Sequence, residues 1–135
     1  MNLIEEIKQS NSIALSSGAK KGNIETCQKK LCSLGAAPMP LSYVNFLNKI
    51  NGIYGQGISV FGVNAKEPYE DIYKKNSLAG AISPNKIFLG ASLTEYFIYD
   101  WFEKSYVIID KKTDNNVLQS PFLEEVLALF LKKYV

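Results

Sequence analysis

The stretch Pro40-Leu-Ser-Tyr-Val-Asn-Phe-Leu-Asn-Lys-Ile-Asn-Gly52, followed closely by Gly57-Ile-Ser-Val-Phe-Gly62, decides the fold of this chain. Proline suits the first turn of a helix, where its missing N–H costs nothing, and Asn51-Gly52 supplies the left-handed residue that ends one. Apolar side chains recur between them at the spacing of a helix that packs into a core: Leu41, Val44, Leu47 and Ile50. The second segment alternates as a strand does. The stretch therefore predicts a buried helix over 41–51 and a strand over 57–62.

Length and composition favour one ordinary globular domain. The chain has 135 residues, of which 47% are hydrophobic and 21% charged. A chain of this size buries about two thirds of its unfolded surface. We expect one domain over 1–135, with an N-terminal helix and loop at 1–22 and a core at 23–135. No apolar run approaches the ~20 residues of a membrane span, and the first residues do not read as a secretory signal, so a cytoplasmic location is expected.

Helices come first in the predicted order, strands follow, and a helix ends the chain. Predicted helices cover 3–10, 23–34, 41–51, 71–79 and 121–134, and a loop covers 16–22. Predicted strands cover 57–62, 87–90, 94–99, 106–109 and 117–118. The strands 94–99 and 106–109 pair as a hairpin that is apolar on both faces, so we expect it to lie centrally. This order predicts an α+β fold with a mainly antiparallel sheet of about four to six strands flanked by helices.

The residue types argue against catalysis and metal binding. The chain has no histidine, which is the commonest general base and metal ligand. Cys27 and Cys32 lack the spacing of a metal or redox motif, and the adjacent carboxylate pairs of the chain point apart on a helix. All fifteen basic residues are lysine, and without arginine specific nucleic-acid binding is disfavoured. We expect no catalytic residue, no metal, no other cofactor and no specific nucleic-acid partner.

Several motifs resemble those of the SUKH superfamily, the Smi/Knr-type domains. The most specific is Pro40-x-x-Tyr43-x-x-Phe46-Leu47-x-x-x-Asn51-Gly52, and weaker elements are Phe61-Gly62, Phe88-Leu89-Gly90, Tyr99-Asp100 and Ile108-Ile109-Asp110. The sequence departs from the pattern at Met39, at Leu93-Thr94 and at Trp101-Phe102. The resemblance covers residue 23 to the C-terminus and implies an α+β domain without an active site. Many bacterial members resemble immunity proteins, which neutralise a toxin encoded beside them, and others are regulatory interaction modules.

The predicted partner-binding surface is built around Trp101-Phe102, in the connection of the central hairpin. An exposed pair of large aromatic residues needs a cover, which is the N-terminal helix, a second copy of the chain in a homodimer, or a foreign partner. Acidic residues in predicted loops and strand ends form the expected rim: Glu67, Glu70, Asp71, Glu95, Asp100 and Glu103.

Two functions remain open from the sequence. The first is an immunity protein that binds a co-encoded bacterial toxin, and the alternative is a regulatory or scaffold module with a cellular partner. An immunity protein against a basic nuclease is expected to be acidic, whereas this chain carries a net charge of +2. The acidic rim must therefore act locally, or the target is not a nuclease.

Overall fold

The computed structural model describes residues 13–55, 57–65, 71–78 and 85–131, and every structural statement below refers to them. The predicted N-terminal helix lies outside these ranges. Within them, no helix reaches the length and apolarity that a membrane span requires.

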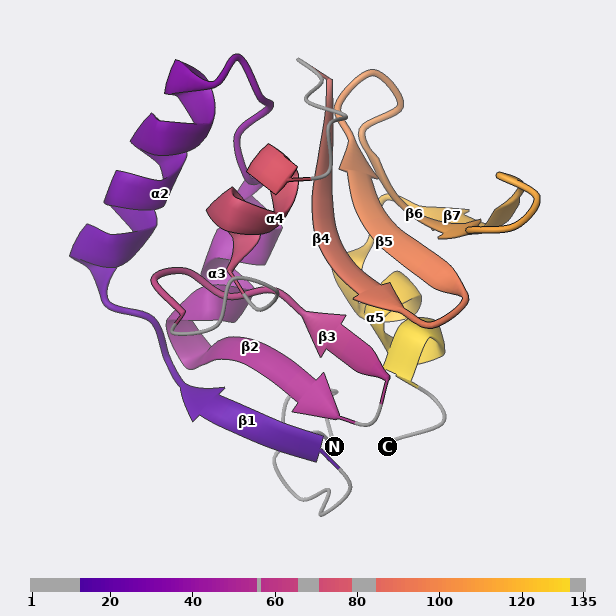
Figure 1. Ribbon diagram of the computed structural model, residues 1–135, viewed down its shortest axis with the longest axis horizontal. Coiled ribbons are helices and arrows are strands. Elements are labelled where there is room, and N and C mark those ends of the chain that lie inside the picture. The colour runs from indigo at the N-terminus through magenta and orange to yellow at the C-terminus, as the bar shows by residue number, and fades with distance from the viewer. Residues whose placement is uncertain (1–12, 56, 66–70, 79–84, 132–135) are drawn as a thin grey trace.

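One antiparallel sheet organises the molecule (Figure 1). Its seven strands follow one another in space in the order of the sequence: β1 (Ile13–Ser17), β2 (Ile50–Gly55), β3 (Ile58–Val60), β4 (Lys86–Ser92), β5 (Glu95–Asp100), β6 (Ser105–Asp110) and β7 (Asn116–Ser120). Four helices accompany it: α2 (Lys21–Ser33), α3 (Leu41–Lys49), α4 (Ile72–Leu78) and α5 (Leu123–Leu131). The predicted α+β class with an antiparallel sheet is confirmed, with one strand more than the expected range of four to six.

The predicted hairpin is confirmed as β5 and β6, which pair from Glu95 with Asp110 to Asp100 with Ser105. The hairpin lies inside the sheet, between β4 and β7. Side chains on both of its faces are buried, among them Phe97 on one face and Ile98 on the other. Burial of both faces is what an interior pair of strands requires.

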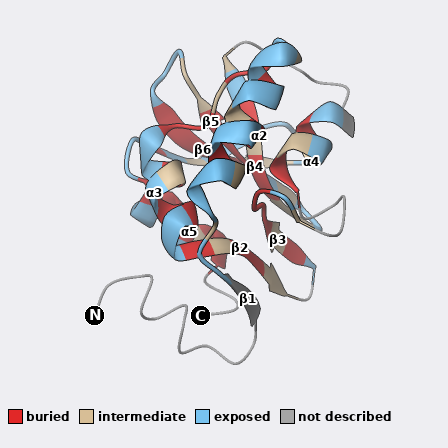
Figure 2. Ribbon diagram, turned by 90° about the vertical axis from the view of Figure 1, so that its left-hand side faces the viewer, coloured by how far each residue is buried: buried red, intermediate tan, exposed pale blue. Residues whose placement is uncertain are grey.

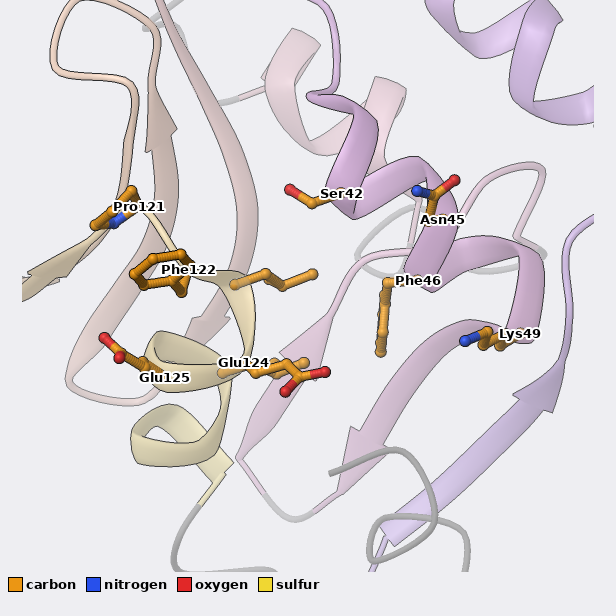
Figure 3. Close-up of a pocket in the computed structure, with 10 residues that line it drawn as sticks. Ser42, Asn45, Phe46, Lys49, Pro121, Phe122, Glu124 and Glu125 are labelled. Carbon is orange, nitrogen blue, oxygen red and sulfur yellow. The ribbon is translucent and has the colours of Figure 1, made fainter. Parts of the chain in front are cut away.

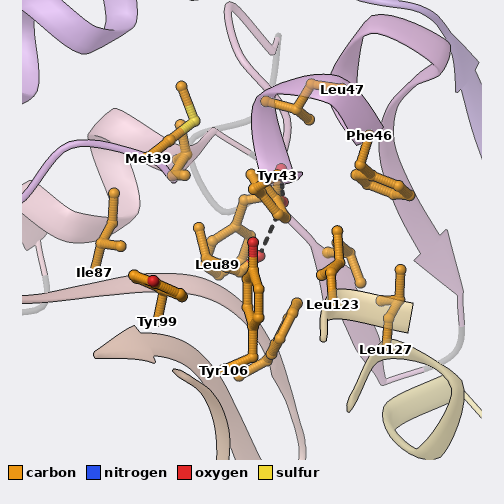
Figure 4. Packing of buried hydrophobic residues seen from close by; sticks show 14 of the residues in the cluster. Met39, Tyr43, Phe46, Leu47, Ile87, Leu89, Tyr99, Tyr106, Leu123 and Leu127 are labelled. Atoms are coloured by element: carbon orange, nitrogen blue, oxygen red, sulfur yellow. Dashed lines mark hydrogen bonds between the residues drawn. The ribbon is translucent and has the colours of Figure 1, made fainter. Parts of the chain in front are cut away.

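The main core lies between the sheet and the helices α3 and α5, as the apolar stripes of these helices predict. Leu47 of α3 and Phe130 of α5 are both buried. Figure 4 shows side chains of α3, α5 and the strands meeting in this layer. Aromatic rings stack through it, since the ring of Phe97 lies 5.5 Å from that of Phe130 and 5.9 Å from that of Tyr106. Figure 2 shows the outer sides of α2, α3 and α5 exposed.

The prediction that Asn51-Gly52 ends a helix is wrong, because both residues lie in β2. The helix α3 stops at Lys49, and the chain enters the sheet at once. The Asn51 side chain bonds to the backbone of Val63, accepting from its N–H at 2.8 Å and donating to its carbonyl at 2.9 Å. Gly52 has a φ of 105°, which glycine tolerates. Strand pairing with β1 and β3 outweighs the local stop signal.

A second difference concerns residues 16–22, which were expected to form a loop. Part of this segment extends β1 to Ser17, and α2 already begins at Lys21 rather than after a cap at Asn23. The strand β1 pairs with β2, which the sequence pattern also missed. The strands β1 and β2 are stabilised by pairing with each other, and neither has a clear alternation of apolar residues, so local periodicity does not predict them.

The two hydrogen bonds between the Asn51 side chain and the backbone of Val63 lead to a stability prediction. We expect Asn51→Ala to lower the free energy of unfolding by about 2–3 kcal/mol, because the N–H and the carbonyl of Val63 both lose their partner. Asn48→Ala, at an exposed position of α3, is the matched control and should change it by no more than ~0.5 kcal/mol. Urea unfolding checks both values, and equal losses in the two variants would contradict the role of Asn51.

Candidate protein-binding surface

Trp101, the predicted apolar anchor, is covered by the chain itself. Its side chain is half-buried against the core, and its indole Nε1–H donates to the carbonyl of Pro38 at 2.9 Å. Its ring meets the edge of Tyr99 at 5.1 Å. The connector before α3 therefore covers part of this indole.

Phe102, the neighbour of Trp101, is 80% exposed. It lies in the four-residue turn between β5 and β6, which Asp100 shapes. One carboxylate oxygen of Asp100 accepts the N–H of Phe102 at 2.9 Å and that of Glu103 at 3.3 Å. Glu103 is exposed beside it. The structure therefore brings Asp100, Trp101, Phe102 and Glu103 together, with Phe102 as the accessible aromatic side chain.

The other predicted rim residues do not join this turn. Glu95 stands at the opposite end of β5, about 17 Å away along a strand that rises ~3.4 Å per residue. Asp71 is buried at the start of α4, where its carboxylate accepts the N–H groups of Ala65 and Lys74 at 3.1 and 3.0 Å. It acts as a helix cap. Glu67 and Glu70 lie outside the described residues.

Two large apolar residues near the starts of α3 and α5 are exposed, and one of them, Leu41, was expected to pack into the core. Leu41 is 74% exposed and Phe122 is 64% exposed. At 100° per residue, Leu41 lies on the opposite side of α3 from the buried Phe46 and Leu47. Phe122 precedes α5, whose first helical residue is Leu123. Each directly follows a proline in the sequence, and the helical wheel of α3 places Leu41 on the outer face.

Three contacts tie together the segments that carry Leu41, Phe102 and Phe122. Trp101, next to Phe102, is bonded to Pro38, three residues before Leu41. Ser42, next to Leu41, shares a hydrogen bond between its hydroxyl and that of Tyr106. Tyr106 pairs with Ser120, two residues before Phe122. We call this region the hairpin end: the turn 101–104, residues 41–42 and residues 121–122.

A groove opens beside the hairpin end, between α3 and α5 (Figure 3). Its cavity volume is about 540 Å³. The side of α3 contributes Ser42, Asn45, Phe46 and Lys49, and the side of α5 contributes Pro121, Phe122, Leu123, Glu124, Glu125 and Leu127. In the figure, Ser42 and Phe122 lie on facing sides of the opening. A second groove of about 710 Å³ lies on the other side of α3, against α2, so that α3 forms a ridge between two hollows.

The titratable groups with shifted pKa values are engaged in the fold. Burial raises the pKa of the Cys27 thiol to about 12, which keeps it protonated and poorly nucleophilic. Burial also raises the pKa of Tyr43 and that of Tyr106, whose hydroxyls are hydrogen-bonded. Backbone N–H groups of Thr113 and Lys112 lower the pKa of Asp110, which shapes a turn. In the described part of the chain, no group of three or more Cys, Asp and Glu side chains could hold a metal ion.

No protein-family model matches this sequence, and a search of curated proteins finds no match. The resemblance to SUKH domains accordingly stays a prediction based on the residue pattern.

The different environments of Trp101 and Phe102 predict different effects on stability. Trp101→Ala should lower the free energy of unfolding by about 2–3 kcal/mol, because it removes core packing and leaves the Pro38 carbonyl without its donor. Phe102→Ala should change it by no more than ~0.5 kcal/mol, because the ring is exposed. Chemical unfolding of both variants tests the assignment, which would be wrong if Phe102→Ala were the more damaging change.

The buried phenol of Tyr106 predicts a loss of stability in alkali. Burial raises its pKa from 10.0 to about 12, while the hydrogen bond with Ser42 acts in the opposite direction. Between pH 10 and 12 the unfolded chain therefore releases a proton that the folded protein retains, so stability falls as pH rises through this window. Below pH 10 this contribution is constant. Urea unfolding from pH 9 to 12 should give a shallower decline for Tyr106→Phe than for the wild type, and an identical decline would refute the assignment.

Proposed function

We propose that this chain is a non-enzymatic protein-binding domain, an immunity protein that binds and neutralises a bacterial toxin encoded beside it in the cytoplasm. The observation that carries the proposal is the hairpin end, where large apolar side chains stand exposed on three segments. The resemblance of the residue pattern to SUKH domains supplies the class of partner.

Exposed apolar area favours a partner because covering it releases about 25 cal/mol per Å². Leu41, Phe102 and Phe122 come from three segments that are tied together by side-chain and strand contacts, so they are held in place before binding. Preorganised aromatic residues are favoured anchors at interfaces, since little conformational freedom is lost when they are covered.

The described residues of the hairpin end carry more carboxylates than lysines, which suits a basic partner. Four carboxylates lie at or next to the hairpin end, Asp100, Glu103, Glu124 and Glu125, against two lysines, Lys104 in the same turn and Lys86 opposite Asp100. Lysines concentrate instead at α2 and α4: Lys20, Lys21, Lys29, Lys30, Lys74 and Lys75. A net charge of +2 is thereby compatible with a local acidic surface, which would steer a basic toxin domain toward the hairpin end.

The genomic neighbourhood separates this function from a regulatory or scaffold module. A toxin gene immediately beside this one supports the immunity function. If the adjacent gene encodes no toxin and capture from the native cells yields a cellular partner, the chain is an interaction module of another kind.

Binding to the adjacent toxin domain tests the surface directly. The double variant Phe102→Ala, Phe122→Ala should weaken the complex at least ~30-fold, because each truncated anchor typically costs on the order of 2 kcal/mol or more. Calorimetry measures the affinity, and growth of cells that express the toxin measures protection.

The matched control is Leu93→Ala, which truncates an 83% exposed apolar side chain in the turn at the opposite end of β5. It should bind and protect as the wild type does. A folded double variant that binds with wild-type affinity would show that the hairpin end is not the toxin-binding surface.

A further inference from the structure

We infer that the groove between α3 and α5 is a docking site for a partner segment that presents an aromatic or other large apolar side chain next to an arginine. This inference rests on the proposed function, since it names the chemistry of the partner that the hairpin end receives. The observation behind it is an apolar cavity with two carboxylates on the α5 wall and a single lysine, Lys49, at the far end of the α3 wall.

The floor of the groove is apolar and already well packed. Phe46, Leu123 and Leu127 line it, and each exposes less than a tenth of its surface. Phe122 stands at the rim with most of its ring exposed. A cavity of about 540 Å³ lies within the range of roughly 300–1,000 Å³ that holds small ligands. It therefore suits one or two inserted side chains rather than a whole helix.

The charge of the groove is concentrated on the α5 wall. Glu124 and Glu125 lie in the first turn of α5, and that helix has no lysine between Leu123 and Leu131. The hydroxyl of Ser120 donates to the Glu125 carboxylate at 2.6 Å and holds it in place. Among the described residues, no hydrogen bond or ion pair engages the carboxylate of Glu124. The wall therefore offers one fixed and one available carboxylate.

The facing wall sets the direction in which a segment would lie. Its polar residues beside the hairpin end are the uncharged Ser42 and Asn45, and its one cation, Lys49, is seven residues further along α3. At 1.5 Å per residue, Lys49 lies about 10 Å from Ser42 along the helix axis. A cationic side chain is thus attracted to the end of the groove near Phe122, and acidic groups to the end near Lys49.

Arginine fits the end near Phe122 better than lysine does. Its planar guanidinium can stack on an exposed aromatic face and donate in pairs to a carboxylate. Phe122 supplies the ring at the rim, and Glu124 supplies a carboxylate on the same wall that extends toward α3. An apolar neighbour of that arginine would cover Phe46 and Leu127 on the floor.

Three small peptides test this chemistry without any toxin. The probe is N-acetyl-phenylalanyl-arginine amide, and the matched probes replace its arginine by glutamate or its phenylalanine by alanine. In amide-resolved NMR titrations at low salt, the probe should give saturable shifts confined to residues around the groove. Each matched probe should bind at least about fivefold more weakly than the arginine probe. This is the scale of one partly screened ion pair or one small apolar contact.

Two variants with matched controls locate the binding. Glu124→Gln should weaken the probe about fivefold, and the difference should shrink as salt screens the charges. Glu95→Gln, which removes a carboxylate at the far end of β5, should leave binding unchanged. A fourth probe replaces the arginine by lysine; Phe122→Ala should abolish the advantage of the arginine probe over it, whereas Leu93→Ala should preserve that advantage. All four positions are at least partly exposed, and melting curves verify that each variant is folded.

The inference fails if the glutamate probe binds as tightly as the arginine probe, if shifts map outside the groove, or if no probe saturates. The proposed function is judged separately, by toxin binding and protection. A chain that protects cells through Phe102 while ignoring the probes would retain the proposed function and overturn the docking chemistry. A chain that binds the probes in the groove but no toxin would retain the docking chemistry and overturn the proposed function.

Discussion

The fold depends on side-chain hydrogen bonds to the backbone at the place where the strands β3 and β4 separate. The strand β3 pairs with β4 as far as Val60 and Gly90, one further backbone bond runs from the Phe61 N–H to the Leu89 carbonyl at 2.8 Å, and beyond it the two chains separate. Buried N–H and carbonyl groups without partners would cost several kcal/mol together. Polar side chains from three elements bond to the backbone there. Tyr43 donates to the carbonyls of Phe61 and Leu89, Asn51 bonds to Val63, and Asn76 bonds to Phe88.

These three side chains also position the helices. Tyr43 fixes α3 over the sheet, and Asn76 fixes α4 against the free edge of β4. Once α3 is fixed, its first turn meets Tyr106 through Ser42, and the connector before it meets the indole of Trp101. The hairpin end is therefore a consequence of the division of the sheet. Its exposed apolar residues are carried by segments whose backbones are held from within.

Trp101 and Phe102 were both expected to be partner-binding anchors, but the structure gives them different roles. Trp101 completes the core and locks a connector, while Phe102, one residue later, is left to the solvent. Leu41 and Phe122 extend the exposed apolar area beyond the turn, and the groove between α3 and α5 gives it depth. A binding surface of this kind combines protruding anchors, a cavity and a local excess of carboxylates, which are the elements of a specific protein interface.

The sequence alone determined the elements that repeat locally. The stripes of α3 and α5 and the hairpin of β5 and β6 follow from periodicities of 3.6 and 2 residues, which each segment carries by itself. Only the tertiary structure decided that Asn51 belongs to a strand, that Asp71 is a buried cap, that Trp101 is covered and that Phe122 is exposed. For Asn51 and Trp101 the decisive contact joins residues 12 and 63 positions apart. Such contacts depend on which distant segments come together in the fold, and no local sequence pattern contains that information.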